Sequence, residues 1–137
     1  MDGFGNDLVW LSVLVQRRYA QICADHELTS AQATLLCAIK DQPQGMGELA
    51  RMLGVAKNAL SGLVDRMERL GLVQRETRTH DRRAVRLNTT AQGKKIVEAL
   101  YADVAERLPD IAGALDAGEQ RVLADSIARI TGVVRKT

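Results

Sequence analysis

The stretch MGELARMLGVAKNALSGLVDRMERL, residues 46–70, has the residue spacing of two helices joined by a tight turn. Ala50, Gly54 and Leu60 stand fifth, ninth and fifteenth in it. A small residue at the fifth place lets two helices cross closely, and glycine at the ninth supplies the positive φ of a tight turn. The spacing therefore predicts a helix-turn-helix, with a plain helical hairpin as the alternative.

The residues that follow predict a two-stranded hairpin. Residues 72–77 and 84–88 alternate weakly between apolar and polar side chains, as strands do, and residues 78–82 are polar, as a turn is. A hairpin in this place can put arginine into the minor groove or against phosphates while the preceding helix enters the major groove. It favours a winged helix over the plain helical hairpin. The arginines in or beside it are Arg75, Arg78, Arg82, Arg83 and Arg86.

Amphipathic helices are predicted on both sides of this central part. Apolar residues recur at three- and four-residue steps in 7–25, and capping boxes open helices at Thr29 and Asp116. Thr90 is predicted to cap a long helix that ends near Leu108. The flanking helices have apolar faces too long for one small lobe to cover, so we expect them to pack together and against a second chain.

These elements predict a mainly α fold with a small β-hairpin wing, of the α+β class. Residues 29–90 are expected to form a winged helix-turn-helix DNA-binding lobe. Residues 1–28 and 91–137 are expected to form a helical dimerisation region.

Charge is unevenly distributed along the chain. Residues 43–90 contain nine basic and five acidic residues, a net charge of +4. The whole chain has 19 basic and 17 acidic residues, so the remainder has 10 and 12, a net charge of −2. A basic middle suits a polyanionic partner such as double-stranded DNA, although a solvated charged surface explains the same asymmetry.

Composition predicts a folded protein in a reducing compartment. Hydrophobic residues make up 46% of the chain and aromatic residues 3%, so the core must be aliphatic. No apolar run approaches the ~20 residues that a membrane helix needs, and no signal peptide is visible. We therefore expect a cytoplasmic protein without membrane contact, in which Cys23 and Cys37 are free thiols.

The sequence shows no arrangement of residues typical of an enzyme. Cys23 and His26 have the spacing of half a zinc site, but a closed site needs four ligands and no second half is evident. A packed thiol near a solvated histidine is the favoured interpretation. We expect no catalytic residues, no metal site and no cofactor.

Four segments resemble the MarR family of transcriptional regulators. They are LTSAQATLL at 28–36, GELARMLGV at 47–55, LVDRMERLGLV at 63–73 and DRRAVRLNTT at 81–90. The resemblance extends over nearly the whole chain, in order. It implies a dimeric regulator that binds a pseudo-palindromic operator. It further implies that Asp81 braces the wing by pairing with a nearby arginine and that Arg83 reaches the minor groove; an exposed surface pair of little consequence is the alternative.

The predicted DNA-binding residues lie on the second helix of the motif and on the hairpin. Relatives in the family often have serine where this chain has Ala56, and many have a basic residue where it has Gly62. The helix is therefore expected to make few direct contacts to base edges, and the wing is expected to supply more of the affinity for DNA. The full set is Lys57, Asn58, Ser61, Arg66, Arg78, Arg82, Arg83 and Arg86.

The resemblance also implies a pocket for a small aromatic or anionic effector, between the helical region and the lobe. Trp10, Tyr19, Met46 and Met52 are the candidates to line it, with ordinary packing as the alternative for each.

The predicted function is that of a sequence-specific DNA-binding transcriptional regulator, a ligand-responsive homodimeric repressor. The alternative is a non-specific architectural DNA-binding protein, which stays open because the second helix of the motif has few side chains to read bases. A winged helix used for protein contacts is a second alternative, against which the basic wing argues.

Overall fold

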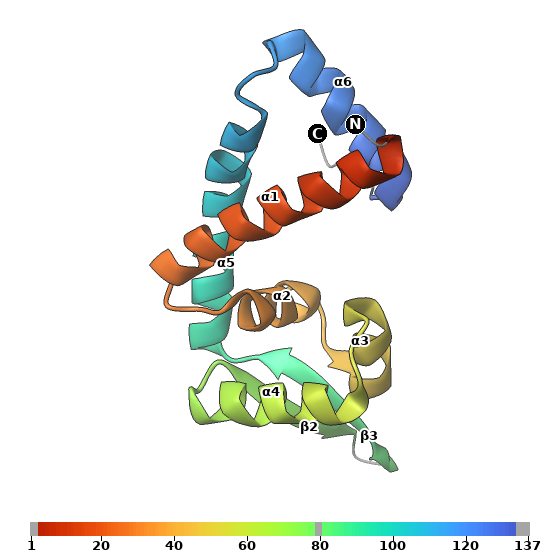
Figure 1. Ribbon diagram of the computed structural model, residues 1–137. Helices are drawn as coiled ribbons and strands as arrows, with labels where there is room; N and C mark the ends of the chain where they lie inside the picture. Colours follow the sequence, from red (N-terminus) through yellow and green to blue (C-terminus); the bar gives the residue numbers. More distant parts are fainter. Residues whose placement is uncertain (1–2, 79–80, 134–137) are drawn as a thin grey trace.

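The computed structural model describes residues 3–78 and 81–133, with the side chains of 77, 78 and 81–84 excepted. Figure 1 shows α4 and the hairpin at one end of the molecule, α1, α5 and α6 at the other, and α2 between them. The elements are α1 (Phe4–Asp25), α2 (Ser30–Ile39), β1 (Gln44–Gly45), α3 (Met46–Leu53), α4 (Lys57–Arg69), β2 (Val73–Arg78), β3 (Asp81–Thr89), α5 (Ala91–Arg107), the 3-10 helix η1 (Leu108–Ala112) and α6 (Ala117–Thr131). The predicted fold class, mainly α with a small β wing, is confirmed.

Local sequence signals set the helix boundaries. The Thr29 hydroxyl accepts from the Gln32 amide, and the Asp116 carboxylate accepts from the Glu119 amide, so both predicted capping boxes form. Gly54 ends α3 with φ at 65°, the left-handed conformation expected of the turn. The helix-turn-helix is therefore built as the spacing predicted.

The sheet has one strand more than the sequence predicted. Strand β1 pairs with β3 through Gln44 and Leu87, which gives the antiparallel order β1-β3-β2. Two residues are too few for an alternating pattern, so this strand exists only because β3 lies beside it. Strand β3 begins at Asp81, a residue expected in the turn. In the strand register the backbone of Asp81 lies opposite that of Arg78 of β2.

The apolar core lies where α2, α3 and α4 meet the sheet, the end of α1 and the first part of α5. Its largest completely buried aliphatic side chains come from all of these elements. The core therefore joins the segment 29–90 to the helices that flank it. These side chains are Ile22, Leu35, Leu36, Ile39, Leu49, Leu60, Val64, Met67, Leu87, Val97 and Leu100.

Helix α5 is fastened to the start of β2. The Thr90 amide donates to the Leu72 carbonyl over 3.1 Å, and the Thr90 hydroxyl donates to the Gly71 carbonyl over 2.6 Å. The same hydroxyl accepts from the Gly93 amide and so caps the helix. One side chain thus joins the segment between α4 and β2 to the first turn of α5.

The outer helices are the least buried part of the structure. Helix α6 has no buried residue along its described length, and α1 buries only Ile22 and Cys23, near its end. No helix among the described ranges is long and apolar enough to cross a membrane.

Candidate nucleic-acid interface

The N-terminal half of α4 borders a hollow on the surface of the lobe. The hollow has a volume of about 540 Å³ and lies between the start of α3, α4 and the sheet. Lys57 and Ser61, both predicted DNA-binding residues, lie one helical turn apart and share its wall. Asn58 is exposed beside them. The remaining lining residues are Gly45, Met46, Gly47, Leu60, Arg75 and Val85.

The start of α4 leaves its first amides without a side-chain cap. Ala56 occupies the N-cap in an extended conformation and makes no side-chain cap hydrogen bond. Free amides at a helix N-terminus and the helix dipole favour an anion such as a phosphate. The Ala56 N-cap therefore leaves backbone donors at the start of α4 that suit an anion.

Arg66 lies on a different face of α4 from Lys57. The two are nine residues apart, which at 3.6 residues per turn rotates them by about 180°. Both side chains are exposed. The helix therefore does not bring Arg66 together with the residues at the hollow.

The strand register gives the positions of the predicted DNA-binding residues in the wing. Arg86 lies on the central strand, opposite Glu76 of β2 and Gly45 of β1, and is half-buried. The side chains of Arg78, Asp81, Arg82 and Arg83 lie outside the described residues. The brace by Asp81 and the minor-groove contact of Arg83 therefore stay predictions.

Arg75 has partners on α4 that the sequence analysis missed. Its Nη2 lies 3.0 Å from Asp65 Oδ1, and its Nη1 donates to Glu68 Oε1. The sequence grouped Arg75 with the DNA-directed arginines of the hairpin. Two carboxylates three residues apart on the preceding helix were the signal for its different role.

The four candidate effector residues are not brought to one place. Trp10 is 70% exposed on α1, and Met46 lines the hollow beside Lys57. Met52 lines a second hollow of about 510 Å³, between α1, α2, α3 and α4. Gln16, Ser30, Thr34 and Leu63 share this second hollow, and the sequence analysis did not identify them.

Tyr19 lies near both cysteines, where α1 packs on α2. Its hydroxyl is 3.4 Å from Thr34 Oγ1, and burial raises its pKa to about 12. Burial also raises the pKa of the Cys23 and Cys37 thiols. Because the thiolate is the reactive form, both cysteines are poor nucleophiles.

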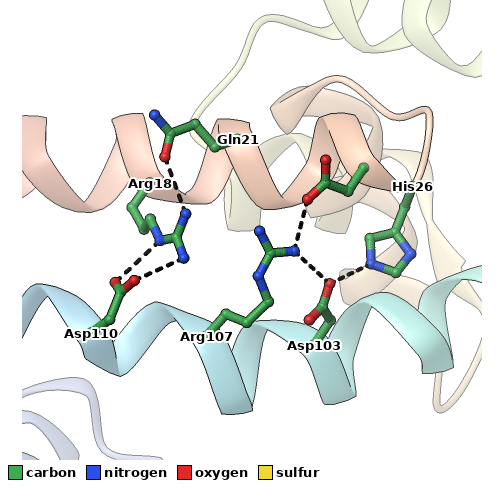
Figure 2. A network of polar contacts seen from close by, with 7 residues as sticks. Arg18, Gln21, His26, Asp103, Arg107 and Asp110 are labelled. Carbon is green, nitrogen blue, oxygen red and sulfur yellow. Dashed lines mark hydrogen bonds and ion pairs between the residues drawn. The ribbon is translucent and has the colours of Figure 1, made fainter.

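A polar network joins the end of α1 to α5 and η1 (Figure 2). His26 Nε2 lies 2.8 Å from Asp103 Oδ2, so the histidine of the Cys-x-x-His pattern contacts a carboxylate of α5. Arg107 donates from Nη1 to Asp25 and to Asp103, and Arg18 pairs with Asp110. The contacts with His26 and Arg107 lower the pKa of the Asp103 carboxyl. In the described part of the chain, no three His, Cys, Asp or Glu residues are grouped as a metal site would be.

The chain is similar in sequence and in fold to known proteins. Residues 26–84 match a family model described as the MarR family. The HTH-type transcriptional repressor NicR of Pseudomonas putida is 32% identical over 104 residues, which are 74% of this chain and 65% of that protein. The match thus spans less than two thirds of the length of this relative.

Two solved proteins have the same fold. MarR from E. coli superposes with a TM-score of 0.85 at 24% identity, over 95% of this chain and 98% of that one. A mutant of it complexed with operator DNA gives 0.77 at 25% identity, over 92% and 91%. NadR in complex with 4-hydroxyphenylacetate gives 0.75 at 23% identity, over 98% and 96%.

Proposed function

Because this chain belongs to the MarR family, we propose that it is a sequence-specific DNA-binding transcriptional regulator that acts as a homodimeric repressor in the cytoplasm. The main support is the hollow at the start of α4, where Lys57, Ser61 and uncapped helix amides lie together beside the sheet. The likeness to MarR complexed with operator DNA supports the same reading. Residues 29–90 would bind the DNA, and residues 1–28 and 91–137 would mediate dimerisation.

The lobe would bind DNA with α4 in the major groove. Lys57 would contact a phosphate, and Asn58 and Ser61 would reach base edges from the first turns of the helix. Arg78, Arg82, Arg83 and Arg86 of the wing would neutralise further phosphates or enter the minor groove. Arg66, on the other side of α4, would contribute only through its charge.

The second chain would cover the apolar surface of the outer helices. Large apolar side chains are exposed along the first half of α1 and along α6, and a monomeric protein does not usually expose so many together. A dimer would place two copies of α4 about 34–36 Å apart, one turn of DNA. The exposed side chains are Phe4, Leu8, Val9, Trp10, Leu11, Val13, Leu14, Val122, Ile127 and Ile130.

A small aromatic acid is the proposed effector, and the hollow that Met52 lines is its proposed site. The hollow has hydroxyl and amide groups from Gln16, Ser30 and Thr34, and apolar walls from α3 and α4. It contacts both the outer helix α1 and the recognition helix α4, so a ligand there would favour one spacing of the lobes over another. NadR, which has the same fold, was solved with such an acid, 4-hydroxyphenylacetate.

Non-specific architectural binding is the second candidate. Gly62 puts no side chain on the outer surface of α4, and a Cβ there would meet open space. A helix that offers few side chains to base edges gains affinity from phosphates without gaining preference between sequences.

A competition experiment separates these candidates. The purified protein would be titrated with its own upstream DNA and with random duplex across a salt series. Strong preference for the upstream DNA supports the regulator, equal affinity supports the architectural protein, and no binding to either overturns both.

Matched lysine variants test the proposed interface in the same experiment. We expect Lys57→Ala to weaken binding and to reduce the slope of log K against log salt by about one. Lys94→Ala removes the same charge from an exposed position on α5 and should leave the slope unchanged. Equal effects of the two would remove Lys57 from the interface.

A further inference from the structure

Arg75 joins strand β2 to helix α4 through two ion pairs. Its Nη2 is 3.0 Å from Asp65 Oδ1, and its Nη1 contacts Glu68 Oε1. The arginine and Glu68 side chains are 35% and 33% exposed, so both are partly withdrawn from solvent. A guanidinium that binds two carboxylates at once is held in orientation as well as in position.

The strand register places Arg75 where it can act on the whole hairpin. Arg75 lies directly opposite Leu87 of β3, and side chains opposite each other share one face of a sheet. Leu87 is completely buried in the core, so this face is the one that packs on the helices. The contact with Asp65 and Glu68 therefore acts on β2, one of the two paired strands of the wing.

We propose that Arg75 is a positioning residue that fixes the angle between the recognition helix α4 and the wing, through Asp65 and Glu68. This inference rests on the proposed function, because it assumes that α4 and the wing bind DNA together. A lobe with this angle fixed before binding loses less conformational freedom when both parts engage. The side chain also borders the hollow of Lys57 and Ser61, so direct phosphate binding by Arg75 is the competing role.

Removal of the two carboxylates distinguishes these roles. Asp65→Asn with Glu68→Gln takes two negative charges from the DNA-binding lobe, so general electrostatics predicts tighter DNA binding. If the role of Arg75 is direct phosphate binding, the double variant frees the arginine for that contact and should also bind DNA more tightly. The positioning role predicts the opposite, a loss of about fivefold or more in affinity for the upstream DNA.

Glu48→Gln is the matched control. Glu48 pairs with Arg51 over 3.0 Å within helix α3, so its removal also takes a negative charge from the lobe but breaks no contact with the wing. We expect this variant to bind as tightly as the wild type or tighter. Tighter binding by the double variant as well would overturn the proposal.

Amide hydrogen exchange in the DNA-free protein gives a readout that does not depend on DNA binding. We expect the β2 and β3 amides to exchange about fivefold faster or more in the double variant, with the exchange of α2 and α5 unchanged. Unchanged exchange in the hairpin would overturn the positioning role. If the wild type shows no preference for its upstream DNA, the proposed function fails, and the exchange experiment alone then decides whether Arg75 holds the hairpin.

Discussion

A Cβ atom on Gly93 would lie 2.0 Å from the carbonyl oxygen of Leu72 and 2.9 Å from its carbonyl carbon. The same carbonyl accepts a hydrogen bond from the Thr90 amide. The first turn of α5 is thus packed against the backbone that begins β2, with no room for a side chain between them. Because the neighbour is backbone that leads directly into β2 and is hydrogen-bonded to Thr90, it cannot move away at low cost.

Gly93→Ala should destabilise the protein by about 1–3 kcal/mol, the usual cost of overpacking. Urea unfolding followed by circular dichroism at fixed protein concentration measures this cost. We expect a lower midpoint with an unchanged slope. A midpoint equal to that of the wild type would show that the contact between α5 and β2 is looser than the structure has it.

Gly62→Ala should stabilise the protein by about 1 kcal/mol, because alanine is the better helix former in the interior of α4. A Cβ at this position meets open space, so no steric cost opposes the gain. The pair of Gly→Ala changes thus has opposite expected signs in the same urea experiment. A destabilised Gly62→Ala variant would show that this face of α4 is covered, as it would be by a second chain.

Ile130→Asp should weaken the proposed dimer. Ile130 is 78% exposed on α6, and a carboxylate buried by a second copy would lose its hydration. Sedimentation at a series of concentrations should show the dissociation constant raised by about tenfold or more. Arg129→Asp puts the same carboxylate on the neighbouring residue and should have the smaller effect. An Ile130→Asp protein that dimerises like the wild type would place the interface elsewhere.

Protonation of Asp103 should lower the stability of the protein as the pH falls. His26 and Arg107 lower the pKa of its carboxyl, so the folded state favours the charged form. The resulting stability is present above the ordinary pKa, about 3.9, and is lost as pH falls through the lower folded value. Urea midpoints of the wild type and Asp103→Asn should therefore differ at pH 6 and converge below about pH 4. If the difference between the two urea midpoints does not change with pH, the effect of the substitution comes from packing and not from the charge of Asp103.

Tyr19 should contribute stability that disappears in strong base. Its pKa is raised from 10.0 to about 12, mainly by burial, so the folded state favours the neutral phenol. The contribution is complete below pH 10 and is lost as pH rises toward 12. In a Tyr101→Phe variant the remaining tyrosine is Tyr19, and its ultraviolet absorbance titration reads this group alone. We expect a midpoint near 12 in the folded protein; a midpoint near 10 would contradict the burial.

The sequence by itself determined the features that depend on neighbouring residues. The capping residues Thr29, Thr90 and Asp116 each bond an amide three residues away, and Gly54 supplies its own turn conformation. Such interactions span one helical turn, so a residue pattern specifies them before the chain folds. The helix-turn-helix, and with it the place of Lys57 and Ser61 at the start of α4, followed from these local signals.

Only the tertiary structure decided which distant residues meet. Strand β1 exists through its pairing with Leu87, and Arg75 contacts Asp65 and Glu68 of α4. His26 lies 77 residues from its partner Asp103. Residue spacing cannot specify such pairs, because the packing of apolar faces around the core sets the distance between elements, and polar side chains then bond whatever that packing brings within reach.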